Sequence, residues 1–310
     1  MRVFLAGASG AIGRRLVPQL LEAGHEVTGM TRSAESAERI RALGAGAAVC
    51  DVFDREQLDT AMREAAPEAV IHQLTALPED FDIRKIDYEP TNRVRTEGTR
   101  NLIDASVAAG TRRMVAQSIA FMYAPEGGTI KDEGDRPFAD APAPFDSGVK
   151  ATLNMEEQVT GTPGLEGLVL RYGQFYGPGT YYAHHGNLAE ETRKRRQPIV
   201  GGGTGVFSFI HVDDAAAATV AAIERGTPGI YNVVDDDPAA MREWVPVYAE
   251  ALGAKPPLRL PKWVGRLAAG SFAVSMATEL RGASNAKAKR ELGWQPRYAS
   301  WRDGFREALG

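Results

Sequence analysis

The chain has 310 residues, with 36 lysines and arginines against 40 aspartates and glutamates, so its net charge is −4. This balance is too mild to indicate nucleic acid or a membrane surface as a partner. The single cysteine, Cys50, excludes an intrachain disulfide and a cysteine-based metal cluster. No cleavable signal pattern opens the chain, and the longest apolar run, near 267–277, is too short to span a bilayer. We therefore expect a cytoplasmic protein without a metal site.

The first half of the chain alternates short apolar runs with helical stretches, which predicts a parallel sheet covered by helices on both faces. The predicted strands are Val3–Ala6, Glu26–Thr31, Ala47–Cys50, Ala69–His72, Met114–Gln117 and Gly167–Tyr172. The predicted helices between them include Gly13–Ala23, Thr91–Ala109 and a segment around Lys150–Val159. The fold class is therefore α/β with a doubly wound parallel sheet.

The pattern loosens in the second half. The run Phe207–Val212 is predicted to be a strand, and Asp213 or Asp214 is expected to cap the alanine-rich helix that follows it. Further on, Asp237 and Pro238 are expected to open another helix as its N-cap and first residue.

No internal repeat or low-complexity linker divides the chain. We expect residues 1–172 to form a cofactor-binding domain and residues 173–310 a smaller cap. Segments within about 206–234 are expected to return to the first domain, because Gly229–Val234 reads as one more strand.

A glycine loop, Gly7-Ala8-Ser9-Gly10-Ala11-Ile12-Gly13, lies between the first strand and the first helix. Gly7 permits the tight turn, Gly10 lets the backbone approach a pyrophosphate, and Gly13 lets helix and strand pack closely. The helix N-terminus then faces the phosphate charge. The predicted cofactor contacts in this loop are Gly7, Ser9, Gly10, Ala11, Ile12 and Gly13.

The end of the second strand predicts which dinucleotide is bound. An acidic residue there would accept hydrogen bonds from a ribose 2′-hydroxyl, but this chain has Arg32. An arginine pairs instead with a 2′-phosphate, and Arg14 is placed to assist. NADP is therefore expected, with NAD as the second choice.

Five further segments follow the glycine loop in order. They are Val70–Thr75, Glu97–Leu102, Leu170–Gly179, Phe209–Asp214 and Glu291–Tyr298. With the loop, they resemble the extended short-chain dehydrogenase/reductase superfamily, in its NAD(P)-dependent epimerase/dehydratase-like branch. The resemblance covers nearly the whole chain. It implies a Rossmann-type sheet with a smaller, mostly helical C-terminal substrate-binding region.

The resemblance also implies further cofactor contacts. Asp51 and Val52 match the residues that hold the adenine, and Tyr172 matches a position near the nicotinamide. A lysine of the family binds the ribose, and Lys150 is its candidate here. The segment expected to lie along the ribose is Leu74, Thr75 and Ala76.

The acid–base residues depart from the family pattern. The family uses a tyrosine four residues before its lysine, but Asp146 stands four residues before Lys150. Alignment of Tyr123 with a family tyrosine puts Ile119 at the place of the catalytic serine, with Ser118 beside it. The candidate catalytic residues are therefore Ser118, Tyr123 and Lys150, in an altered arrangement.

The expected substrate contacts depart as well. Phe207 stands where nucleotide-sugar enzymes of the family place an arginine for the diphosphate, and Gln174 replaces an asparagine. With Tyr176, these residues indicate a less charged, partly apolar ligand. Arg95 replaces the asparagine usual in its helix.

These observations favour an NADP-dependent oxidoreductase that reduces a small, partly apolar carbonyl or enone substrate. Two alternatives remain open at this point: epimerase or dehydratase chemistry, and a non-enzymatic NADP-binding sensor or regulator. The family resemblance further implies a homodimer that packs the helices 91–109 and 150–159 together.

Overall fold

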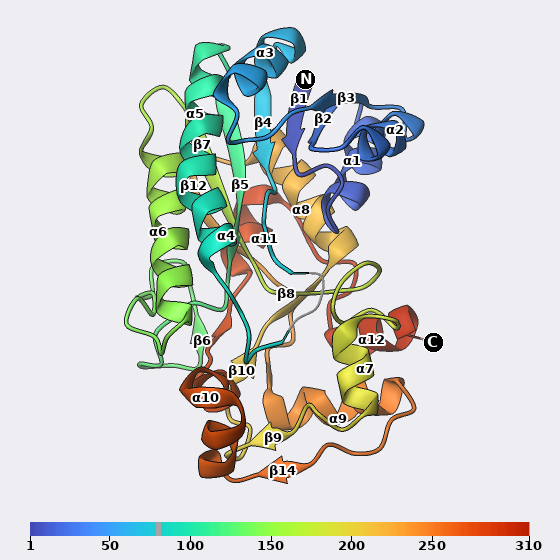
Figure 1. Cartoon of the computed structure of the whole chain (residues 1–310), viewed down its shortest axis with the longest axis vertical. Coiled ribbons are helices and arrows are strands. Elements are labelled where there is room, and N and C mark those ends of the chain that lie inside the picture. Colours follow the sequence, from blue (N-terminus) through green and yellow to red (C-terminus); the bar gives the residue numbers. More distant parts are fainter. Residues whose placement is uncertain (79–81, 310) are drawn as a thin grey trace.

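The computed structural model describes residues 1–78 and 82–309. Its central sheet has seven parallel strands in the order β12-β7-β5-β4-β1-β2-β3 (Figure 1). Along the chain these strands are β1 (Arg2–Ala6), β2 (Glu26–Thr31), β3 (Gly46–Val49), β4 (Ala69–His72), β5 (Arg113–Ile119), β7 (Glu166–Tyr172) and β12 (Gly229–Val233). The order reverses between β1 and β4, and such sheets bind ligands at the carboxyl ends of the strands beside that point. The predicted doubly wound α/β sheet is confirmed.

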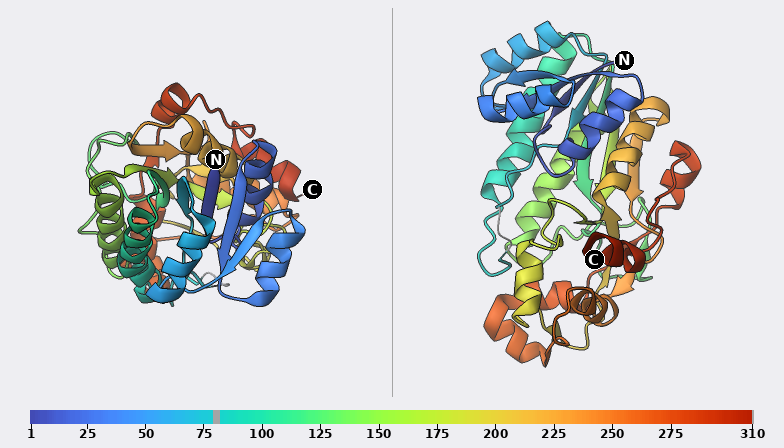
Figure 2. Two further views of the ribbon diagram at one scale, coloured as in Figure 1. Left: turned by 90° about the horizontal axis from the view of Figure 1, so that it is seen from above. Right: turned by 90° about the vertical axis from the view of Figure 1, so that its right-hand side faces the viewer.

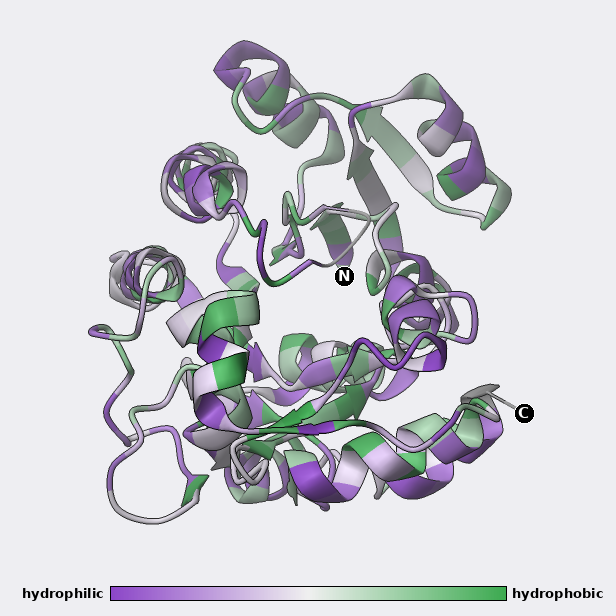
Figure 3. Cartoon of the chain, turned by 60° about the horizontal axis from the view of Figure 1, so that its bottom comes forward, coloured by the Kyte–Doolittle hydropathy of each residue, from purple (hydrophilic) through white to green (hydrophobic). Residues whose placement is uncertain are grey.

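Helices cover both faces of the sheet. One face carries α1 (Gly13–Glu22), α2 (Ala34–Ala42), α8 (Val212–Arg225) and α11 (Ala286–Leu292). The other face carries α3 (Arg55–Ala65), α5 (Thr99–Ala108) and α6 (Phe145–Gly161). Figure 3 shows the helices in alternating hydrophobic and hydrophilic colours, as expected when each buries one stripe. Two apolar cores result, one on each side of the strands.

Helix α5 is the last part of a longer helical segment. It is preceded by α4 (Glu89–Arg93) and by a π-helical turn, η1 (Val94–Gly98), with helical backbone angles at each junction. A π turn widens a helix and re-aims its side chains, and such turns are frequent at functional sites. This turn contains Arg95.

The cap lies beyond the carboxyl ends of the strands (Figure 2, right). Its helices are α7 (Asn187–Arg193), α9 (Met241–Ala251), α10 (Lys262–Thr278) and α12 (Trp301–Leu309). Short strand pairs join these helices: β8 (Gln174–Tyr176) with β11 (Phe209–His211), β10 (Val206–Phe207) with β13 (Ala239–Ala240), β9 (Ile199–Val200) with β14 (Arg259–Leu260), and β6 (Ile130–Lys131) with β15 (Gly282–Ala283). Its core is aromatic, with Trp244, Tyr248, Phe209 and Phe305 almost fully buried.

The start of the alanine-rich helix differs from the prediction. The predicted strand 207–212 is broken at Ser208 into β10 and β11, which lie outside the central sheet. Helix α8 then begins at Val212, and the Nδ1 atom of His211 accepts the amide N–H of Asp213 at 3.2 Å. Neither aspartate is the cap. Asp213 pairs with Arg15 at 2.7 Å, and Asp214 accepts two backbone amides near the C-terminus.

The prediction that Asp237 and Pro238 open a helix was also wrong. Residues Ala239–Ala240 form strand β13, and helix α9 begins only at Met241. The Asp237 carboxylate instead accepts the Ser300 hydroxyl and the Arg302 guanidinium, which joins this turn to the start of α12. Long-range partners have here replaced a local cap.

Candidate active site

The glycine loop is closed by backbone contacts. Gly7 has a φ of 95°, and a Cβ atom placed on it would lie 2.8 Å from the backbone of Gln73. A Cβ on Gly13 would lie 2.2 Å from the carbonyl oxygen of Gly7. Neither position has room for a side chain. Gly10, by contrast, is exposed, and a Cβ on it would meet only the Gly7 oxygen, at 3.3 Å.

The start of α1 is open to a ligand. No side chain caps this helix. The Arg14 and Arg15 amides donate to the carbonyls of Gly10 and Ile12, whereas the amides of Ala11, Ile12 and Gly13 have no partner among the described residues and remain available to an anion. Ser9 and Gly10 are exposed, Ala11 is half-buried and Ile12 is buried. These features fit the pyrophosphate of a dinucleotide, which needs free N–H groups at a helix N-terminus and close access to the backbone.

Arg32 lies directly after β2 and is exposed. Within residues 1–78 and 82–309 it forms no ion pair, so its guanidinium is free for an external anion. Arg14 is also exposed, and its Nη2 atom lies 3.0 Å from where a Cβ of Gly179 would be. Arg14 therefore lies between the glycine loop and the start of the cap.

The other expected cofactor residues lie along the same edge of the sheet. Asp51 is half-buried and accepts the amide of Phe53 at 2.9 Å, and the carbonyl of the buried Val52 accepts Asn101 at 3.0 Å. The segment 74–76 is tied back by two hydrogen bonds. The Leu74 amide donates to His72 Nδ1 at 3.2 Å, and the Ala76 amide donates to Thr91 at 3.3 Å.

Tyr172 is fully buried under this edge. Its hydroxyl accepts a hydrogen bond from Gln73 at 3.2 Å and pairs with the Thr219 hydroxyl at 2.6 Å. Burial raises the pKa of Tyr172 to about 12. This hydroxyl is engaged in packing the sheet against α8.

Ser118 belongs to a buried ion-pair network. Its hydroxyl donates to Glu156 at 2.5 Å, and Glu156 pairs with Arg171 at 2.6 Å, with both charged side chains less than 5% exposed. A buried pair of this kind is stable only when its remaining polar atoms are also satisfied. The Ser118 hydroxyl fulfils that role for Glu156.

Tyr123 extends the same network. Arg171 Nη1 donates to its hydroxyl at 3.0 Å, and that hydroxyl donates to Asn232 at 2.7 Å. Burial raises the pKa of Tyr123, although Arg171 and Asn232 oppose the shift. The structure therefore brings Ser118 and Tyr123 together, with both hydroxyls engaged by protein partners.

Lys150 lies apart from them. One buried face of α6, here called its packed face, carries Gly148, Thr152 and Glu156, spaced four residues apart; it meets Tyr88 at Gly148 and the sheet at Glu156. Lys150 is on a different face, its side chain is 61% exposed, and it pairs with Asp146 at 2.9 Å. Lys150 stabilises the ionised Asp146, which lowers the pKa of that carboxyl. On the packed face, Gly148 and Thr152 are four residues apart, as the tyrosine and the lysine of the family are. They therefore occupy the positions at which those two catalytic side chains would be expected.

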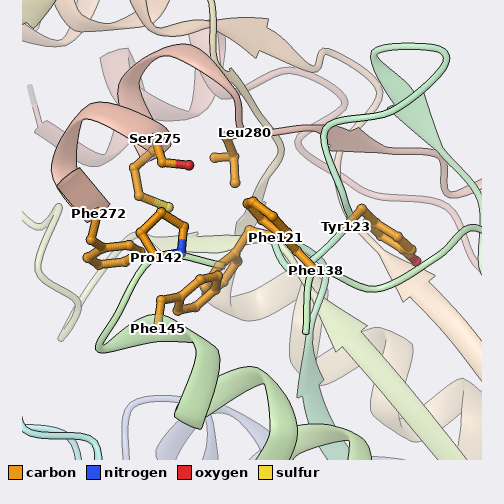
Figure 4. A pocket seen from close by; sticks show the side chains of 9 residues that line it. Phe121, Tyr123, Phe138, Pro142, Phe145, Phe272, Ser275 and Leu280 are labelled. Atoms are coloured by element: carbon orange, nitrogen blue, oxygen red, sulfur yellow. The ribbon is translucent and has the colours of Figure 1, made fainter. Parts of the chain in front are cut away.

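A small aromatic pocket lies at the carboxyl end of β5, between the start of α6 and the cap helix α10 (Figure 4). Its lining residues are Phe121, Tyr123, Phe138, Pro142, Phe145, Phe272, Ser275, Met276 and Leu280. Phe145 stacks between Phe121 and Phe272, with ring centroids 6.5 Å and 5.0 Å apart. The sequence prediction included only Tyr123 from this set. The sequence analysis did not use the phenylalanines that follow β5, Phe121 and Phe138, or Phe145 at the start of α6.

The predicted substrate residues lie elsewhere. Tyr176 and Phe207 are buried in the aromatic core of the cap, where Tyr176 packs on Phe305 and Phe207 packs on Trp244. Gln174 is half-buried on β8, and its backbone N–H donates to the Ser208 carbonyl at 2.7 Å. None of the three lines the aromatic pocket among the residues that the structure describes.

The family model described as "NAD dependent epimerase/dehydratase family" matches residues 3–233. The chain belongs to this family. It is 45% identical to a 3-diazoavenalumate denitrifying reductase from a Streptomyces species, over 98% of this chain and 99% of that protein. It is 28% identical to a ketoreductase of a farnesylated dihydroquinoline oxide from Stigmatella aurantiaca, over 82% and 74% of the two chains.

Among solved structures, UDP-glucose 4-epimerase from Thermus thermophilus, in complex with NAD, aligns with a TM-score of 0.76. It is 26% identical, and the alignment covers 100% of this chain and 98% of that one. The chain is thus an NAD(P)-dependent oxidoreductase of the extended short-chain dehydrogenase/reductase type, which takes a nicotinamide dinucleotide. No helix in the described part of the chain is long and apolar enough to cross a membrane.

Proposed function

We propose that this enzyme is an NADP-dependent reductase whose substrate accepts hydride without a protein acid. One observation carries the proposal. The hydroxyls of Ser118 and Tyr123 are engaged in the Glu156–Arg171 network, and the packed face of α6 presents Gly148 and Thr152. Neither Tyr123 nor the positions 148 and 152 of α6 therefore supplies a free tyrosine hydroxyl to protonate a developing alkoxide.

The cofactor would be held by the glycine loop and the N-terminus of α1, with Asp51 and Val52 at the adenine and the segment 74–76 along the ribose. Arg32, exposed and unpaired in the described chain, is the group that supports a preference for a 2′-phosphate. When bound, the reduced nicotinamide supplies the hydride.

The electrophile that matches this site best is an aryl diazonium with a carboxylate. A diazonium is already positively charged, so its terminal nitrogen accepts a hydride as a new N–H bond without a proton donor. In the resulting aryl diazene the aryl–nitrogen and N–H bonds then break, the hydrogen passes from nitrogen to the aryl carbon as a new C–H bond, and dinitrogen leaves. The name of the Streptomyces relative describes a denitrifying reductase of a diazo carboxylate, and the phenylalanines around the pocket offer aromatic faces against which an aryl ring can pack.

A carbonyl or enone is the second candidate, and the ketoreductase relative from Stigmatella aurantiaca supports it. The two candidates differ in what the protein must supply. Reduction of a carbonyl requires a proton on the oxygen, which water would have to deliver here, whereas a diazonium requires none.

A matched pair of probes separates these candidates. 4-Carboxybenzenediazonium and 4-formylbenzoate share the ring and the carboxylate and differ only in the electrophile. We expect faster enzyme-dependent NADPH oxidation with the diazonium, after subtraction of the rate without protein. A higher rate with the aldehyde would contradict the proposal. NADH in place of NADPH should lower the rate.

We further propose that residues 1–172 form the cofactor-binding domain and 173–310 the cap, with the segment 206–234 returning to the first. The contacts of α8 with α1 and the pairing of β12 with β7 support this division. A homodimer through the helices 91–109 and 150–159 stays a prediction, which light scattering would test.

A further inference from the structure

Arg95 is a buried cation that forms no ion pair within residues 1–78 and 82–309. It lies in the π turn η1, and it is 7% exposed. Its only hydrogen bond to the described residues runs from Nη1 to the Gly148 carbonyl, at 3.4 Å. No described carboxylate lies within 4 Å of its guanidinium, unlike that of Arg171. A buried guanidinium left in this state is costly unless an anion joins it.

The neighbouring titratable groups do not supply that anion. Both oxygens of Glu156 are taken, one by Ser118 and Arg171 Nε and the other by Arg171 Nη2. His72 is fully buried, and burial together with the positive charge of Arg95 lowers its pKa to about 4. It is therefore neutral at pH 7. Burial likewise lowers the pKa of Arg95 to about 10, which leaves Arg95 protonated.

Tyr88 connects this cation to the aromatic pocket. Three of its ring carbons lie 3.2–3.5 Å from where a Cβ of Gly148 would be, so the ring fills the space beside that glycine. On its other side the ring packs against Phe145, with centroids 6.1 Å apart. The Tyr88 hydroxyl makes no hydrogen bond to any described residue, and the field of Arg95 opposes the rise in pKa that burial causes.

We propose that Arg95 and Tyr88 form an anion subsite that binds the carboxylate of an aromatic substrate whose ring packs against the aromatic side chains around Phe145. This inference rests on the proposed reductase function and specifies its substrate class. The guanidinium fork and the phenol hydroxyl supply charge-assisted hydrogen bonds to one carboxylate. Binding that carboxylate gives Arg95 an ion-pair partner that none of the described side chains provides.

Two probes test the subsite without turnover. Cinnamate and cinnamamide have the same ring and chain, but only cinnamate carries a carboxylate. Titration of the NADP-loaded wild-type protein by calorimetry should show cinnamate binding roughly 10- to 100-fold more tightly than cinnamamide. In Arg95→Gln that preference should disappear, while the affinity for cinnamamide stays unchanged. The matched control is Arg100→Gln, an exposed arginine on the next helical turn, which should keep the preference.

Thermal melting provides a second measurement. Arg95→Gln removes an unpaired buried charge, so the Tm without ligand should stay the same or rise, and cinnamate should no longer raise it. Tyr88→Phe should reduce the acid preference less than Arg95→Gln does. A wild-type protein that does not prefer the acid would overturn the inference. So would an Arg95→Gln variant that loses both probes equally or melts earlier, because Arg95 would then be structural.

The two proposals fail separately. If cinnamate is preferred through Arg95 but 4-carboxybenzenediazonium is not reduced, the subsite stands and the proposed reaction is wrong. If the diazonium is reduced equally well by wild type and Arg95→Gln, and both bind cinnamate equally, the reaction stands and the subsite is overturned.

Discussion

The glycine loop and the packed face of α6 meet the same edge of one sheet, but they are determined in different ways. In the loop, Gly7 and Gly13 face backbone atoms, at 2.8 Å and 2.2 Å from where a Cβ would lie. On α6, Gly148 faces the side chain of Tyr88 at 3.2 Å. Backbone cannot move aside, whereas a side chain can be exchanged for another. Under the proposed function, the loop belongs to a cofactor half that keeps the family's glycines. The α6 face then belongs to a substrate half, here called the rebuilt half, in which Gly148 and Thr152 replace the family's tyrosine and lysine.

The largest effect should come from the network beneath the rebuilt half. Glu156→Ala leaves Arg171 buried and unpaired, and it should lower the free energy of unfolding by roughly 3–5 kcal/mol. The double variant Glu156→Met/Arg171→Met removes both charges and should lie within about 1 kcal/mol of wild type. Urea denaturation measures both variants. If the double variant is as unstable as the single one, the loss of stability comes from the missing hydrogen-bond network and not from the unpaired charge of Arg171.

The backbone closure of the loop predicts the next effect. Gly13→Ala forces a Cβ against the Gly7 carbonyl, so we expect a loss of roughly 3 kcal/mol in stability and a loss of NADPH binding. Gly161→Ala is the matched control, because no atom lies within 4 Å of its added Cβ. Calorimetric titration with NADPH gives the readout. Normal binding by Gly13→Ala would show that the loop tolerates side chains as α6 does.

His72, at the boundary between the two halves, predicts a pH dependence. Burial, with Arg95, lowers its pKa from 6.5 to about 4 in the folded protein. Below pH 6.5 the unfolded chain therefore takes up a proton that the folded one does not, so stability falls as the pH drops to about 4. The loss due to His72 should reach about 3 kcal/mol and then level off. His72→Gln should lack this part of the fall in denaturation series at pH 7, 5.5 and 4.

Arg32 should give the smallest effect, on affinity alone. Arg32→Ala should weaken NADPH binding by roughly 10- to 100-fold and leave NADH binding unchanged, because only NADPH carries the 2′-phosphate. Arg63→Ala, an exposed arginine on α3, is the control. If the wild-type protein binds NADPH and NADH with equal affinity, the proposed preference for NADP is wrong.

The same contrast explains what the sequence predicted. The strands of the central sheet, the position of the glycine loop between β1 and α1, and the fold class follow from local apolar periodicity and backbone geometry, and they are confirmed. The rebuilt site depends on contacts between distant segments, such as Tyr88 on Gly148 and Ser118 on Glu156. In the sequence, Lys150 was taken as the family's lysine, which put Asp146 at the place of the tyrosine. In the structure, Glu156 shows which side of α6 is buried, because it pairs with Arg171 on β7, and this pairing cannot be seen from the sequence of α6 alone. The caps of α8 and α9 were missed for the same reason, because distant groups engage the aspartates.

Dinitrogen released per NADPH oxidised is the most direct test of a reductase that works without a protein acid. With 4-carboxybenzenediazonium as substrate, mass spectrometry should show one N2 and one benzoate for each NADPH consumed, above the rate without protein. Tyr123→Phe should keep that ratio. Turnover of 4-formylbenzoate without any enzyme-dependent N2 from the diazonium would contradict the account.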